Sequence, residues 1–152
     1  MSIAGGARDR SYWMLAGRWG YILIDELGSG PLRGSLQYGI EVIPVLVMSQ
    51  SSTVYAAGFS PLQLRYNFIA TRRSVPYVEI GGAILGSTEP VPENTSRLNF
   101  LTHGGVGLQL LYHQSRTLQI GMRYQHISNA GIAEHNPGIN SLYFFTGLSW
   151  WQ

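Results

Sequence analysis

The chain has 152 residues, enough for one domain and too few for two of ordinary size, so we expect a single domain over residues 1–152. Hydrophobic residues make up 45% and charged residues only 12%, about half the usual charged share of a globular protein. The net charge of +2 comes from scattered arginines without a basic stripe, so nucleic acid is not an expected partner. The absence of cysteine excludes disulfides and thiolate metal sites.

No stretch of the sequence approaches the ~18 consecutive apolar residues that a membrane-spanning helix requires. A membrane protein without such helices has to use a closed sheet, because only helices and barrels satisfy every backbone polar group inside lipid. The N-terminal stretch MSIAGGARDR contains no apolar signal-peptide segment. An exported protein would therefore be represented here by a processed or truncated chain.

From residue 12 onward, apolar residues alternate with polar residues or glycine, which is typical of β-strands that have one apolar face. In residues 12–24 the apolar row comprises Trp13, Leu15, Trp19, Tyr21 and Leu23. The same pattern recurs in residues 34–48, 62–70, 75–87, 97–114, 116–129 and 140–151. Turns rich in Gly, Pro, Asn and Ser separate these seven strands, and SIAGGAR near the N-terminus is a candidate remnant of an eighth.

Strands of this length and pattern predict an all-β fold, an antiparallel eight-stranded transmembrane β-barrel whose first strand is short or truncated. A soluble barrel or sandwich also alternates and is the alternative fold. We favour the membrane barrel because the polar row is poor in charge and rich in glycine. In addition, aromatic residues lie near the strand ends, where interfacial girdles form. The expected location is the bacterial outer membrane.

The lengths of the connections predict how this barrel is oriented. Outer-membrane barrels have short periplasmic turns and longer external loops. The short connections at residues 71–74 and 114–116 therefore belong to the periplasmic side, and the longer ones at 88–96 and 130–139 belong to the outside.

His126 and Ser128 end the strand 116–129, next to the external loop. Because successive side chains of a strand point to opposite faces, both share a face with an apolar row that we expect to face lipid: Leu118, Ile120, Met122 and Tyr124. A spacing of about 7 Å along a strand lets the two side chains reach one another. The pair fits a serine nucleophile and a histidine general base, which together hydrolyse esters.

The stretch QHISNAG, followed by NPGINS, resembles the lipid A 3-O-deacylase family (PagL-type, acyloxyacyl hydrolase-like) of outer-membrane barrels. The segments FSPLQLRYNF, PYVEIGGAIL and SRLNF precede it in the expected order, and only the first strand is poorly matched. The resemblance implies an enzyme that removes an ester-linked acyl chain from the lipid A of lipopolysaccharide, with no metal and no cofactor. Lipid A, lipopolysaccharide and outer-membrane lipid are then the expected partners.

Carried over by position, the resemblance makes His126 the base, Ser128 the nucleophile and Asn129 the residue whose amides help to bind the oxyanion. The family has a glutamate where this chain has Asn140. Asparagine can orient an imidazole through a hydrogen bond but supplies no charge, and Glu134 is the candidate substitute acid. The alternative function is therefore a non-catalytic barrel of the same family, a structural or partner-binding subunit in a homo-oligomer or hetero-oligomer.

Other polar residues are expected to have structural roles. Glu41 and Glu79 lie on the inward row and are expected to pair with Arg18 or Arg65. Two inward histidines are expected to form hydrogen bonds in the lumen rather than bind metal: His103 and His113. The acyl chain of the substrate would lie on the outer wall beside Met122, Tyr124 and Phe144.

Overall fold

The computed structural model describes residues 11–69, 73–113 and 115–150. It contains seven strands: β1 (Tyr12–Leu27), β2 (Gly34–Ser49), β3 (Thr53–Phe68), β4 (Ser74–Ser87), β5 (Leu98–His113), β6 (Arg116–Ser128) and β7 (Ile139–Trp150). A three-residue 3-10 helix, η1 (Gly30–Leu32), lies between β1 and β2. No helix in these described ranges is long and apolar enough to cross a membrane.

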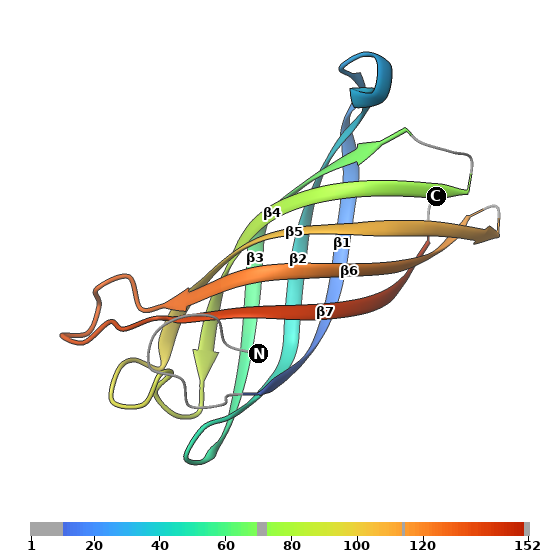
Figure 1. Cartoon of the computed structure of the whole chain (residues 1–152). Coiled ribbons are helices and arrows are strands. Elements are labelled where there is room, and N and C mark those ends of the chain that lie inside the picture. The colour runs from blue at the N-terminus through green and yellow to red at the C-terminus, as the bar shows by residue number, and fades with distance from the viewer. Residues whose placement is uncertain (1–10, 70–72, 114, 151–152) are drawn as a thin grey trace.

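The seven strands form one antiparallel sheet in chain order, so the prediction of an all-β antiparallel fold is confirmed. The sheet is strongly curled, and β7 crosses in front of β1 in Figure 1. At one end these two strands meet, where the Ser141 hydroxyl donates to the Tyr12 hydroxyl over 3.3 Å. Among the described residues, β1 and β7 form no ladder with each other. The candidate eighth strand, SIAGGAR, lies outside the described residues, and so does part of the predicted single domain.

The third strand is longer than the sequence pattern predicted. We expected it to begin at residue 62, whereas β3 begins at Thr53. Its pairing with β4 shifts register between Phe59 and Leu62. Such a bulge inserts an extra residue and breaks the alternation of faces. The first half of β3 was therefore missed because its pattern is out of phase with the second half.

The alternation itself predicts correctly which side chains point outward. Trp13, Trp19 and Phe144 are 60%, 62% and 78% exposed, whereas the polar Gln63 and Gln125 are completely buried. A water-soluble protein has the opposite arrangement, since buried polar groups are the exception there. An apolar exterior around a polar interior is the pattern of a barrel that sits in lipid.

The polar interior is held together by ion pairs around Glu79. Its carboxylate accepts hydrogen bonds from Arg18 at 2.7 Å, Arg65 at 2.9 Å and Arg123 at 2.5 Å. Arg123 also donates to Glu41 at 3.1 and 3.2 Å. The predicted partners of Glu79 are thus confirmed. The prediction for Glu41 is wrong, because the Arg123 guanidinium from β6 reaches across the interior and lies between both carboxylates.

The two histidines assigned to the lumen differ. His103 is buried, and its Nε2 atom forms a 3.0 Å hydrogen bond with Gln63 Oε1, as expected. His113 is exposed at the end of β5, so its prediction is wrong. The pairing of β5 with β6 shifts register between Leu111 and His113, which takes the last residue out of the inward row.

An apolar cluster fills the interior at the end where β6 stops and β7 starts. Ile127 and Ile139 contribute to it from the two strands and are 1% and 6% exposed. The other members come from β2 to β5 and from the β4–β5 connection: Ile43, Leu46, Met48, Val54, Ala83, Leu85, Val91 and Leu101. The outward residues next to Ile127 and Ile139 therefore rest on a close-packed support.

Candidate active site

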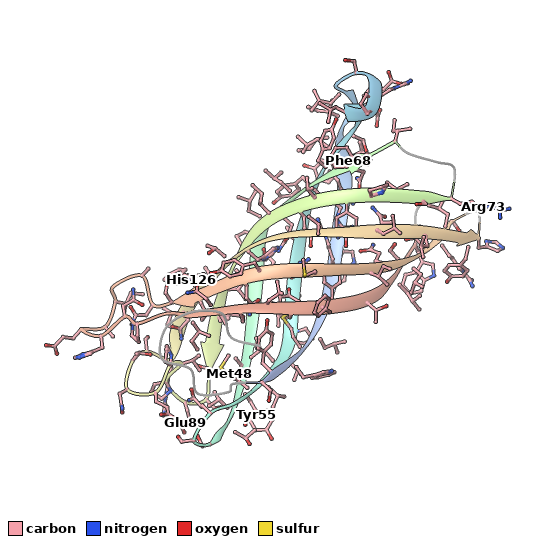
Figure 2. The ribbon with its side chains drawn as sticks, in the orientation of Figure 1. Met48, Tyr55, Phe68, Arg73, Glu89 and His126 are labelled. Atoms are coloured by element: carbon pink, nitrogen blue, oxygen red, sulfur yellow. The ribbon has the colours of Figure 1, made fainter. Side chains whose placement is uncertain are left out.

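The pairing of β6 with β7 brings together His126 and Asn140, which are 14 positions apart in the sequence. They are direct partners in the register, and His126 Nδ1 lies 2.8 Å from Asn140 Oδ1. Figure 2 shows His126 at the loop end of β6. The contact that the sequence suggested between these two side chains is present.

This hydrogen bond determines which imidazole nitrogen carries the proton. An amide oxygen can only accept, so Nδ1 of His126 is the donor to Asn140 Oδ1. In a neutral imidazole the other nitrogen, Nε2, then keeps its lone pair. His126 is therefore in the tautomer that can accept a proton from a hydroxyl group.

Ser128 is the last residue of β6 and lies two positions beyond His126, on the same face. Both are half-buried. On the neighbouring strand β5, His126 is paired with Thr102 and Ser128 with Phe100. The pair thus lies on the outer wall at the end of the strand, as the alternation predicts.

Asn129 organises the loop that follows. It is 1% exposed, its backbone N–H donates to Asn136 Oδ1 over 3.0 Å, and its side-chain amide donates to the His135 carbonyl over 2.8 Å. Its Oδ1 accepts from the Gly131 N–H over 2.9 Å. The backbone N–H of Asn129 and one N–H of its side-chain amide, the groups that the resemblance assigned to the oxyanion, therefore form hydrogen bonds within the loop.

Asn136 is a residue of this loop that the sequence reasoning did not single out. The NPG turn at 136–138 was a local signal for a turn, but its hydrogen bond back to Asn129 depends on the tertiary structure. Glu134, the candidate substitute acid, is exposed in the same loop. The imidazole partner at Nδ1 is Asn140, not Glu134.

The wall around the pair is largely apolar. Met122 is paired with Phe144 and Tyr124 with Leu142, and Tyr124 is 47% exposed. Within the part of the chain that the structure describes, no group of three or more His, Cys, Asp or Glu side chains could hold a metal ion.

A cavity of about 480 Å³ lies elsewhere, in the seam between β1 and β7. It is lined by apolar residues such as Trp13 and Leu148 and by the interior residues Arg18 and Arg123. Neither His126 nor Ser128 lines it. We therefore place the candidate chemistry on the outer wall and not in this cavity.

Comparisons with known proteins agree with this fold. The crystal structure of the outer membrane enzyme PagL is similar to this chain, with a TM-score of 0.68 and 20% sequence identity, over 90% of this chain and 95% of that chain. At this identity the likeness shows the fold alone. No curated protein matches the sequence.

The family is shown by the sequence. The model of the family described as "Lipid A 3-O-deacylase (PagL)" matches residues 4–149, nearly the whole chain. The resemblance inferred from QHISNAG is thus confirmed, and the outer membrane is the location of the protein. The chain belongs to the lipid A 3-O-deacylase (PagL) family of outer-membrane β-barrel proteins.

Proposed function

We propose that this chain is itself an active serine esterase that removes one ester-linked acyl chain from lipid A, at the outer leaflet. The observation that carries the proposal is the hydrogen bond from His126 Nδ1 to Asn140, on the same outward face as Ser128. The family description indicates the 3-O-linked chain as the one removed.

In the proposed mechanism, Ser128 Oγ attacks the ester carbonyl carbon while Nε2 of His126 takes the hydroxyl proton. The imidazolium that forms is held in position by Asn140. The tetrahedral intermediate then collapses, and His126 returns the proton to the departing sugar hydroxyl. A water molecule, activated by the same imidazole, hydrolyses the acyl–Ser128 ester and releases the fatty acid.

The location of the pair suits a lipid substrate. The acyl chains of lipid A can stay against the outer wall beside Tyr124 and Phe144, which are 47% and 78% exposed. The ester lies near the polar headgroup and meets Ser128 where β6 ends. The substrate therefore does not have to leave the membrane.

Asn140 is the feature that favours the alternative function, a structural or partner-binding barrel with no activity. A neutral amide orients His126 but does not stabilise its cation as a carboxylate would. We expect activity that is lower than that of a site with an acid, not absent.

The direct test is incubation of the refolded protein with lipopolysaccharide, followed by mass spectrometry of lipid A. The wild type should remove one acyl chain, and Ser128→Ala should remove none. Ser115→Ala is the matched control, because Ser115 is an exposed serine in the turn at the opposite end of β6. If wild type and Ser128→Ala behave alike, the esterase proposal is wrong and the structural alternative gains support.

A further inference from the structure

Gly138 lies directly against the imidazole of His126. A Cβ atom added to Gly138 would be 2.6 Å from Cε1, 3.2 Å from Nε2 and 3.5 Å from Nδ1 of that ring. Carbon atoms in contact are normally about 3.5–4.0 Å apart. Only a residue without a side chain leaves the ring in its present place.

The backbone at Gly138 is held on both sides and cannot simply retreat. The next residue, Ile139, starts β7, pairs with Ile127 and is buried in the apolar cluster. Earlier in the loop, Asn129 binds Asn136 and the His135 carbonyl. An added side chain at position 138 would therefore displace the ring rather than the loop.

We infer that Gly138 is a positioning residue for the general base, His126. The main chain of Gly138, which has no side chain, packs on the imidazole ring and keeps Nδ1 bonded to Asn140 and Nε2 free for Ser128. The inference rests on the proposed function for its catalytic consequence, but the contact itself does not. Gly138 supplies no chemical group to the reaction and acts only through the position of the His126 ring.

The size of the effect follows from the clash. Moving the ring away from a methyl group by about 1 Å restores a normal contact distance. A shift of that size breaks the 2.8 Å hydrogen bond to Asn140. Misplacement of a reacting group by about 1 Å costs roughly 100-fold in rate. We expect Gly138→Ala to lower kcat by about this factor with little change in KM, because the acyl-binding wall is untouched.

Backbone strain needs a separate control, since Gly138 has φ +64°. Gly30 has φ +56° and nothing within 4 Å of an added Cβ, and it lies at the opposite end of the sheet. Gly30→Ala thus has a similar φ cost without a clash. Gly138→Asn separates backbone strain from the clash with the His126 ring at the site itself. Asn tolerates positive φ better than Ala, but its side chain is larger. It also provides a second variant if Gly138→Ala fails to fold.

The experiment combines steady-state kinetics on lipopolysaccharide with NMR of ¹⁵N-histidine-labelled protein in micelles. The His126 signals are identified as those that are missing from the spectrum of the His126→Gln variant. We expect the Nδ1–H tautomer in wild type and Gly30→Ala, and its loss in Gly138→Ala and Gly138→Asn. In activity, Gly138→Asn should be no better than Gly138→Ala.

The inference is overturned if folded Gly138→Ala keeps the Nδ1–H tautomer and a kcat within about twofold of Gly30→Ala. Recovery of kcat in Gly138→Asn would also overturn it, because relief of strain alone would then explain the loss. If the wild type is inactive but the tautomer still disappears in both Gly138 variants, the positioning role stands and the proposed function fails.

Discussion

Replacement of Asn140 by Asp should raise the rate of deacylation, because it adds a negative charge without moving the atom that contacts the imidazole. Asn140 Oδ1 lies 2.8 Å from His126 Nδ1. The charge centres of a carboxylate and a protonated imidazole in this geometry would be about 4 Å apart. Opposite charges at that separation attract by about 4 kcal/mol at an effective dielectric constant of about 20, and by about 1 kcal/mol in bulk water.

The site lies between these limits, since His126 and Asn140 are both half-buried. The amide already supplies a hydrogen bond, so only the added charge contributes to the gain. We expect the transition state to be stabilised by about 1 to 3 kcal/mol, which corresponds to a rise in kcat of roughly 5- to 150-fold.

The assay is the initial rate of fatty acid release from lipopolysaccharide, measured by mass spectrometry. Asn140→Glu and Asn140→Gln form a second pair, equal in length and different in charge, and the Glu variant should be the faster of the two. If the folded Asp and Glu variants are no faster than wild type and Asn140→Gln respectively, stabilisation of an imidazolium at His126 is not part of the rate-limiting step. The reasoning from Asn140 would then be wrong.

Two further predictions concern neighbouring residues of β4 that face opposite sides of the sheet. Glu79→Gln should lower the free energy of unfolding by about 3–5 kcal/mol, because it leaves buried arginines without their carboxylate. The control, Glu89→Gln, removes an exposed ion pair and should lower it by less than about 1 kcal/mol. Urea unfolding in lipid vesicles measures both variants, and equal small losses would contradict a central role of Glu79. Ile80→Arg should lower the free energy of unfolding by about 2–4 kcal/mol in the same vesicles, because Ile80 is 61% exposed near the middle of a strand that faces lipid. Ile80→Leu is the control. A loss below about 0.5 kcal/mol for the arginine variant would mean that this face of the sheet meets water.

Much of the site could be predicted from the sequence, because a strand alternates its faces with a period of two residues. That local rule places His126 and Ser128 on the apolar outer row and Glu79 and Arg123 inside. The motif QHISNAG was enough to identify the family, which the match over residues 4–149 confirms. These inferences needed no knowledge of which strands are neighbours.

Contacts between distant residues were decided only by the tertiary structure. Arg123 reaches Glu41 from 82 positions away, and Gly138 meets the His126 ring only because the loop folds back over it. Register shifts likewise put the two halves of β3 out of phase, which hid its first half, and took His113 out of the inward row. Alternation specifies the face of each side chain, whereas the register, the bulges and the curvature of the sheet determine which side chain it meets across the interior. The register, the bulges and the curvature depend on hydrogen bonding between strands and on the packing of the whole sheet. No single segment of the sequence contains that information.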